Sequence, residues 1–253
     1  MTWFDTHCHL DMGPLAARPA EVMAAARGEG VEHVLAVAYD RASLSVVPGL
    51  ARLPGVVVAL GQHPWVAHES LDRDELSSLL ATSGAVAVGE IGLDFRVADA
   101  PPRERQIAQL TWQLELAVDL GLPISLHVRG AFDDMFAVLA RFRPRLRGAV
   151  HAFSRGATLA ERFVAMGLHI AFGGAVTQDN AHAAHEAARA VPLDRLLVET
   201  DAPAIAVRRC PAEEIEPRHV AQVGESLAEL RSLTQEEIAR ITTDNARGLF
   251  LAP

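Results

Sequence analysis

The chain has 253 residues and contains no lysine, so all 23 of its strongly basic side chains are arginines. Schiff-base catalysis needs a lysine amine and is therefore excluded. A metal bridge made from a modified lysine is excluded for the same reason. Any bridge between two metal ions in this protein has to come from another side chain, such as a carboxylate.

Cysteine and long apolar runs are also scarce. The two cysteines, Cys8 and Cys210, exclude a disulfide framework and agree with a reducing compartment. No apolar run reaches the roughly 18–20 residues of a membrane span. Residues 1–9 have neither a basic start nor a small-residue cleavage site, so we expect no signal peptide. These features predict a cytoplasmic protein without membrane association or an obligate protein partner.

The formal net charge of −9 argues against broad, non-specific binding to nucleic acid, which favours a basic surface. Local charge can differ from the total. Five arginines follow the predicted strands described below, and they are Arg96, Arg129, Arg155, Arg208 and Arg209. They could form a basic mouth for a phosphodiester, since arginine contacts phosphate in a bidentate manner, or they could be solvated loop residues.

Short apolar runs alternate with longer amphipathic stretches along the whole chain. The runs are rich in valine, isoleucine and leucine, which is typical of parallel strands covered on both faces. The predicted strands are residues 3–7, 33–38, 56–61, 86–91, 123–128, 148–153, 169–173 and 196–201. A Gly-x-Gly-x-x-Gly turn is missing after the first of them, which removes the main support for a dinucleotide-binding sheet.

Eight strand–helix units in this length predict an α/β fold, the closed (β/α)8 TIM barrel, as a single domain over residues 1–253. Two helix signals stand out between and after the strands. One helix is expected to start after Pro101 and Pro102 and to end at Gly121, with an apolar stripe at helical spacing. Thr234 followed by Glu237 is typical of a capping box.

Polar residues that bind metals or protons gather at the ends of the predicted strands. They are His7, His9, Gln62, His63, Glu90, His127, His151, Glu199 and Asp201. Barrel active sites lie at the carboxyl ends of the strands, and a buried strand rarely ends in such groups without a partner. This pattern predicts a metal site at that end of the barrel.

His7 and His9 are two residues apart, so both rings should lie on one face of the strand, with Cys8 on the other. Two converging imidazoles suit one divalent ion, although two hydrogen-bonded surface histidines would give the same pattern. Asp5 shares their face and could accept a hydrogen bond behind them. Cys8 is expected to be a small buried apolar residue.

Glu90 follows an apolar strand and has a glycine on either side, Gly89 and, after Ile91, Gly92. Glycine permits close backbone approach. The two oxygens of one carboxylate can bridge two metal ions, so Glu90 is the natural bridge. A glutamate solvated at a strand end is the alternative.

His127 and His151 close consecutive strands and together could supply the second ion. We assign Asp201 to the first ion and to the attacking water, whose proton it would take or position. Glu199 would orient a ligating histidine. Two ions about 3.5–4 Å apart can activate a shared water and stabilise a leaving oxygen. This donor set suits Zn²⁺, Mn²⁺ or Mg²⁺.

Taken together, six segments resemble the TatD-type deoxyribonuclease family of the metal-dependent hydrolase superfamily. These are residues 5–11 (DTHCHLD), 61–64 (GQHP), 89–95 (GEIGLDF), 127–129 (HVR), 151–154 (HAFS) and 199–203 (ETDAP). They occur in the family's order and span nearly the whole chain. Residues 103–106, at the start of the long helix, are also similar.

The resemblance implies a barrel of the metallo-dependent hydrolase type that cuts DNA with divalent metal ions. It implies the same ligand set, namely His7, His9, Glu90, His127, His151 and Asp201. It further implies that His63 faces the substrate. Among the arginines at the mouth, Arg129 is our candidate for a second substrate contact. Two positions depart from the family's pattern: Arg155 stands where glycine is usual, and Ile215 where asparagine is usual. Both concern the loops at the mouth and bear on substrate identity.

Three functions remain open from the sequence. The first is phosphodiester hydrolysis with Asp201 and Glu90 in the catalytic centre and DNA as the favoured substrate. The second is hydrolysis of an amide, an ester or an aminoacyl ester at the same two metal ions. The third is a binding pocket without catalysis, against which the complete ligand set argues. Trp65, Phe95 and Phe153 lie near strand ends, where each could stack on a base or pack within the protein.

Overall fold

The computed structural model describes residues 1–252 and contains one sheet of eight parallel strands in the order β1 to β8. The strands are β1 (Trp3–Cys8), β2 (Val31–Val37), β3 (Val56–Leu60), β4 (Ala87–Asp94), β5 (Ile124–Arg129), β6 (Gly148–Val150), β7 (Leu168–Phe172) and β8 (Leu196–Val198). Each strand is paired with the next one along the chain, as a barrel built from successive strand–helix units requires.

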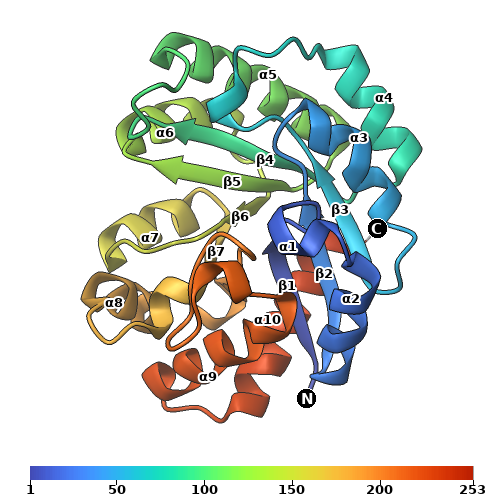
Figure 1. Cartoon of the computed structure of the whole chain (residues 1–253). Coiled ribbons are helices and arrows are strands. Elements are labelled where there is room, and N and C mark those ends of the chain that lie inside the picture. Colours follow the sequence, from blue (N-terminus) through green and yellow to red (C-terminus); the bar gives the residue numbers. More distant parts are fainter. Residues whose placement is uncertain (253) are drawn as a thin grey trace.

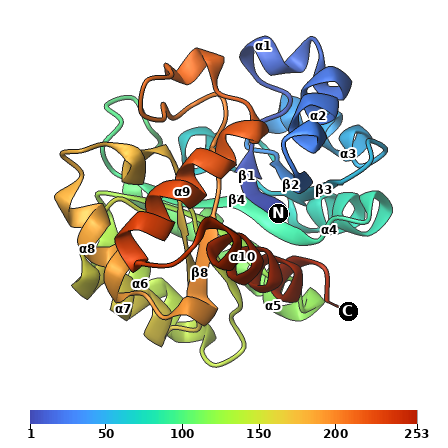
Figure 2. The same ribbon diagram turned by 90° about the horizontal axis from the view of Figure 1, so that it is seen from below.

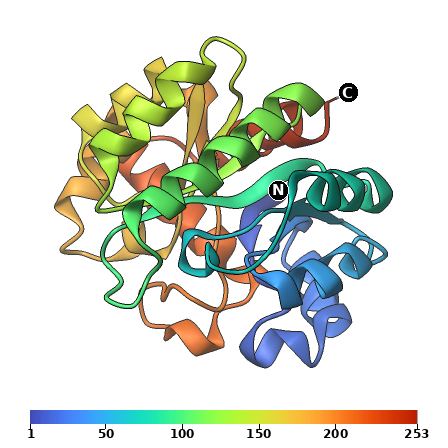
Figure 3. The same cartoon turned by 90° about the horizontal axis from the view of Figure 1, so that it is seen from above.

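Helices lie outside the strands, and the chain runs once around them, from blue to red in Figure 1. The α-helices are α1 (Gly13–Ala16), α2 (Pro19–Gly28), α3 (Arg41–Leu50), α4 (Arg73–Ser83), α5 (Arg103–Leu120), α6 (Phe132–Leu139), α7 (Ala157–Ala165), α8 (His182–Ala190), α9 (Val220–Arg231) and α10 (Gln235–Phe250). The longest, α5, is green in Figure 3 and packs against β4. Among residues 1–252, no helix combines the length and the apolar character that crossing a membrane requires.

The segment that follows β8 brings the last strand beside the first and nearly closes the barrel. The backbone N–H of Asp201 donates to the carbonyl of His7 over 2.9 Å, and that of His9 donates to Ala202 over 2.8 Å. The hydroxyl of Thr6 also donates to the carbonyl of Val198 (3.0 Å). These bonds place Asp201 next to the two histidines of β1.

The interior of the barrel is packed with side chains. A buried cluster inside it includes Phe4, Leu35, Val37, Ala59, Ala87, Ala149, Ala171 and Leu197. Phe250 and Leu249 of α10 belong to the same cluster, so α10 covers the amino-terminal end of the barrel. Figure 2 shows this helix beside β8 and the amino terminus. The metal site predicted from the strand ends therefore lies at the opposite end of the barrel, where the strands have their carboxyl ends.

The predicted barrel is confirmed, and some strand ends differ from the prediction. β6 and β8 each stop three residues early, at Val150 and Val198, while β4 continues to Asp94. Ala152 and Asp201 have positive φ angles of 48° and 52°, which no strand can contain. His151 and Asp201 therefore lie just beyond their strands. The predicted helix start near Pro102, its end at Gly121 and the Thr234 capping box are all present.

Candidate metal centre

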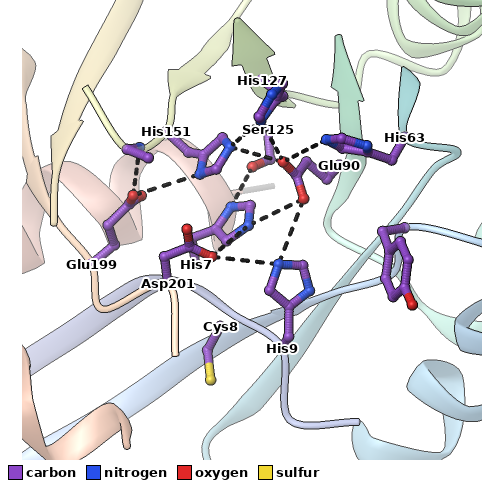
Figure 4. Close-up of polar contacts among 12 residues, drawn as sticks. His7, Cys8, His9, His63, Glu90, Ser125, His127, His151, Glu199 and Asp201 are labelled. Atoms are coloured by element: carbon purple, nitrogen blue, oxygen red, sulfur yellow. Dashed lines mark hydrogen bonds and ion pairs between the residues drawn. The ribbon is translucent and has the colours of Figure 1, made fainter. Parts of the chain in front are cut away.

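Six of the histidine and carboxylate side chains predicted from strand ends converge at the carboxyl end of the barrel, and His63 joins them (Figure 4). All seven are at least 86% buried. Three groups have ligand atoms within 4.8 Å of one another. The groups are His7 with His9 and Asp201, His7 with Glu90 and His151, and His63 with Glu90 and His127.

Glu90 lies at the centre of this cluster, and its two oxygens face different partners. Oε1 lies 2.8 Å from Nε2 of His151 and 3.0 Å from Nδ1 of His127. Oε2 lies 3.5 Å from Nε2 of His7 and 3.6 Å from Nε2 of His9. This division is the arrangement that a bridging carboxylate needs.

Asp201 closes the side of the cluster formed by β1. Its Oδ1 lies 3.4 Å from Nε2 of His9 and 3.8 Å from Nε2 of His7. Cys8, between the two histidines, points away from the cluster toward the carbonyl of Ala202, as period-two geometry predicts. His7, His9, Asp201 and Oε2 of Glu90 thus surround one position, and Oε1 of Glu90, His127 and His151 flank another.

Other side chains hold three of the imidazoles from behind. Nδ1 of His7 lies 3.1 Å from the hydroxyl of Ser125, and Nε2 of His127 lies 3.3 Å from Oδ2 of Asp94. Nδ1 of His151 lies 3.7 Å from Oε1 of Glu199, which also accepts the backbone N–H of Ala152. Such partners fix the ring orientation and the tautomer of a metal-binding histidine.

His63 is oriented as a hydrogen-bond donor. Its Nδ1 accepts the backbone N–H of Trp65 over 3.2 Å, at the start of the short helix η1 (Pro64–Val66). Burial lowers the pKa of His63 to about 4, so the ring is neutral near pH 7. A neutral ring with an accepting Nδ1 carries its proton on Nε2, which faces Oε1 of Glu90 at 3.4 Å. The ring therefore presents an N–H, where a metal would need a lone pair.

Two glycines allow β4 to approach β5 closely at the site. A Cβ atom at Gly92 would lie 1.9 Å from the carbonyl oxygen of His127, and one at Gly89 would lie 2.7 Å from Cβ of Ser125. Neither position can accept a side chain without moving β5. The glycines on either side of Glu90 thus bring its carboxylate within reach of His127.

The charges within the cluster influence one another strongly. Burial opposes ionisation of Glu90, but the charge of His151 and the hydrogen bonds from His127 and His151 hold the pKa of Glu90 well below the usual range. Burial and the proximity of His151 lower the pKa of His7. Burial also opposes protonation of His151, but Glu90 and Glu199 raise the pKa of His151 well above its usual value. The carboxylates of the cluster therefore favour positive charge at this place, which suits a cation.

Unsatisfied buried atoms test whether these residues fit a metal ion. Nε2 of His7 and Oδ1 of Asp201 are buried and lack a hydrogen-bond partner among residues 1–252, although both point into the cluster. A buried polar atom without a partner costs free energy, and a bound cation would remove that cost. Imidazole and carboxylate ligands suit Zn²⁺ and Mn²⁺. The cluster therefore fits divalent metal, and the ligand role of each residue stays our prediction.

Two other residues were predicted at the site, Arg129 as a substrate contact and Asp5 as a partner behind the histidines. Arg129 lies at the mouth, with its Nη1 3.8 Å from Oδ2 of Asp94. Asp5 contacts no imidazole nitrogen. Its carboxylate accepts the backbone N–H and hydroxyl of Thr200 and the backbone N–H of His7, so it ties β1 to the segment after β8.

The sequence analysis missed Ser125 and Asp94 as partners of the histidines. Asp94 was visible in the sequence as the last carboxylate of the segment at residues 89–95. Ser125 gave no signal, since a lone serine within an apolar strand is ordinary. Of the three aromatic residues near strand ends, Phe153 is buried in the core, while Trp65 is 43% exposed beside the cluster.

A cavity of about 450 Å³ adjoins the cluster at the carboxyl end of the barrel. Its lining includes His127, His151 and Asp201 of the cluster, together with Trp65, Arg129 and Arg155. Arg208 and Arg209 line a different cavity, and Arg208 is paired with Asp179 at 2.5 Å. Of the five arginines that could form a basic mouth, Arg129 and Arg155 line this cavity, whereas Arg96, Arg208 and Arg209 do not.

Comparison with known proteins agrees with this geometry. The family model described as TatD related DNase matches residues 4–251. An uncharacterized metal-dependent hydrolase, YabD of Bacillus subtilis, is 35% identical over 251 residues, which cover 98% of each chain. The 3'-5' ssDNA/RNA exonuclease TatD of Erwinia billingiae is 34% identical over 260 residues and 99% of each chain.

A solved structure is similar over nearly the same span. The crystal structure of YJJV, a TatD homolog from Escherichia coli K12, superposes with a TM-score of 0.90 at 34% identity. The alignment covers 99% of this chain and 98% of that one.

Proposed function

This chain belongs to the TatD-related DNase family of metal-dependent hydrolases, and from that premise we propose that it cleaves phosphodiester bonds in DNA. The observation that carries the proposal is the division of the Glu90 carboxylate between two sets of ligands. Oε2 faces His7 and His9, and Oε1 faces His127 and His151. Two adjacent cation positions that share a carboxylate are typical of enzymes that hydrolyse phosphate esters.

We infer that two divalent ions bind here. His7, His9, Asp201 and Glu90 would hold one, and Glu90, His127 and His151 the other. When bound, two such ions activate a water molecule and stabilise the charge on the phosphoryl group. The donor set favours Zn²⁺ or Mn²⁺ over Mg²⁺.

Asp201 is suited to take the proton of the attacking water. Its carboxylate lines the cavity, and Oδ1 has no hydrogen-bond partner among the residues described. Attack at phosphorus requires the water to lose a proton, and a carboxylate at this position can accept it. The positive φ of Asp201 and its backbone bond to His7 fix the carboxylate beside the cluster.

We propose that His63 and Arg129 bind the substrate. The Nε2–H of His63 can donate to a non-bridging phosphoryl oxygen, and the exposed guanidinium of Arg129 can bind the same phosphate. Trp65 offers an exposed aromatic surface on which a base can stack. This combination of donors and an aromatic surface suits a nucleotide.

The named activity of a relative supports a nucleic-acid substrate. The protein from Erwinia billingiae that is 34% identical to this chain is named a 3'-5' ssDNA/RNA exonuclease. We propose a similar substrate for this chain, which would act as a single catalytic domain in the cytoplasm.

A metal-supplemented cleavage assay tests the proposal. Metal-stripped protein is incubated with single-stranded DNA, double-stranded DNA or RNA, and Mg²⁺, Mn²⁺ or Zn²⁺ is added back. We expect metal-dependent release of nucleotides that is absent in Asp201→Asn. Lack of cleavage with every metal, although metal analysis finds ions bound to the protein, would contradict the proposal and favour an ester or amide substrate.

A further inference from the structure

A second cavity, of about 350 Å³, adjoins the one beside the metal-binding cluster. Phe132 and Arg155 line both cavities, so the two are neighbours, and we call them together the groove. None of the clustered histidines or carboxylates lines the second cavity. A ligand group bound there cannot be the group that reacts.

The second cavity contains arginines with no acidic partner. Within residues 1–252, neither Arg96 nor Arg155 has a carboxylate oxygen within 4.0 Å. Two acidic residues, Asp133 and Asp134, share the lining, but each has its own arginine. Asp133 lies 3.9 Å from Arg162, and Asp134 is paired with Arg103. The two unpaired guanidinium groups therefore make this part of the groove suitable for an anion.

Each of the two exposed arginine side chains packs against one neighbour. The guanidinium of Arg155 lies over the ring of Phe132, 5.7 Å from its centroid. Arg96 packs against the backbone at Gly130, where an added Cβ would lie 2.8 Å from Cγ of the arginine. The φ of Gly130 is +67°, a conformation that also favours glycine.

We propose that Arg96 and Arg155 form a second phosphate subsite, which binds the phosphate next to the scissile one in a single strand. This subsite rests on the proposed function, because the reacting phosphate has to lie at the cluster. Arg155 lines both cavities, so it lies between the positions of the two phosphates. Arg96 lines the second cavity and binds the phosphate that is farther from the metal-binding cluster. The substrate is then a strand of at least three nucleotides, and affinity rises with the first added phosphate.

The experiment measures binding of thymidine oligonucleotides by isothermal titration calorimetry. The protein is Asp201→Asn, which keeps the groove without turnover, both stripped of metal and with Mn²⁺. We expect the pentanucleotide to bind at least tenfold more tightly than the dinucleotide. Adding Arg96→Ala and Arg155→Ala should remove most of that difference. The affinity for the dinucleotide should stay within about twofold of its value in Asp201→Asn alone. The slope of log affinity against log salt should fall by about 0.7 for the lost phosphate contact.

Two control variants separate a phosphate subsite from a general effect of charge. Arg208→Ala with Arg209→Ala removes the same charge from the other cavity and should leave the length dependence unchanged. Arg155→Lys in the Asp201→Asn background keeps the positive charge and should retain part of the length dependence. Thermal unfolding of each variant reports on folding.

The outcomes distinguish the subsite from the proposed function. Equal loss of affinity for both oligonucleotides, unchanged affinity for the pentanucleotide, or no binding of either would overturn the subsite. If the unaltered protein cleaves DNA but the arginine variants keep the length dependence, the function stands and the subsite is wrong. If it cleaves no nucleic acid yet shows an arginine-dependent preference for length, Arg96 and Arg155 bind a phosphate, but the hydrolytic function fails, and with it the assignment of this phosphate as the neighbour of a scissile one.

Discussion

The indole N–H of Trp65 donates a hydrogen bond to Oδ2 of Asp94 over 2.8 Å. The same oxygen lies 3.3 Å from Nε2 of His127. Burial opposes ionisation of Asp94, but the bond from His127 and the others it accepts lower its pKa to about 2. One ionised carboxylate thus orients both a predicted metal ligand and the exposed aromatic side chain at the mouth.

The first prediction concerns Asp94→Asn. The amide has no charge and only one acceptor oxygen. If that oxygen accepts from Trp65 and His127, the amide NH2 faces the backbone N–H of Arg96, which the second carboxylate oxygen accepts in the unaltered protein. We expect the affinity for Mn²⁺ or Zn²⁺ to fall about 10–100-fold, as is usual when a partner behind a metal ligand is lost. Calorimetric titration of the stripped protein measures this. Trp65→Phe is the matched control, since it loses the indole N–H but should keep metal affinity.

The second prediction concerns the bridge. Glu90→Gln keeps the size of the side chain but removes the charge shared by the two sets of ligands. We expect at most one ion per chain by elemental analysis, and turnover below detection, with circular dichroism unchanged. Two retained ions with near-normal turnover would contradict the bridging role.

The third prediction separates a substrate contact from a metal ligand at His63. Because its Nδ1 accepts the N–H of Trp65, we expect His63→Leu, whose side chain has no donor, to keep the full metal content. Loss of one donor to a charged phosphoryl oxygen should lower kcat about 10²–10³-fold. Elemental analysis and steady-state kinetics test the two parts separately. A lower metal content would show that His63 is a ligand.

The fourth prediction concerns removal of metal. The clustered carboxylates and imidazoles are buried, and several of their atoms lack partners within residues 1–252. An ion that binds the folded chain at 100 times its dissociation constant adds about 2.7 kcal/mol. Stripping with a chelator should therefore lower Tm by several degrees, and Mn²⁺ or Zn²⁺ should restore it. An unchanged melting curve would argue against ion binding at the cluster.

The fifth prediction concerns pH and lies at the other end of the barrel. Burial, with a contribution from Arg195, lowers the pKa of His169 to about 4, against about 6.5 in an unfolded chain. The unfolded chain therefore takes up a proton as pH falls below 6.5, while the folded one does not until about pH 4. Stability is lost over that window, by about 2 kcal/mol between pH 7.5 and 5. Urea unfolding at several pH values measures it.

The control for this prediction is His169→Gln, which cannot titrate. It should lose about 2 kcal/mol less than the unaltered protein between the same two pH values. Parallel curves for the two proteins would show that His169 does not cause this part of the pH dependence.

The sequence by itself determined the barrel and the set of residues that meet in it. Parallel strands place all their carboxyl ends together, so His7, Glu90, His127 and Asp201 had to converge once each was placed at a strand end. The apolar strands gave the alternation, and the glycines on either side of Glu90 indicated close approach of β4 and β5. These features follow from local pattern.

Only the tertiary structure decided how those residues face one another. The division of the Glu90 oxygens and the proton position on His63 depend on side chains that are distant in sequence. Arg155 and Arg208 both follow strands, yet one lines the groove and the other pairs with Asp179, because loop paths are set by packing. The strand pattern fixes which end of the barrel a residue occupies. The direction in which its side chain points, and the residue with which it pairs, depend on the path of the folded loops.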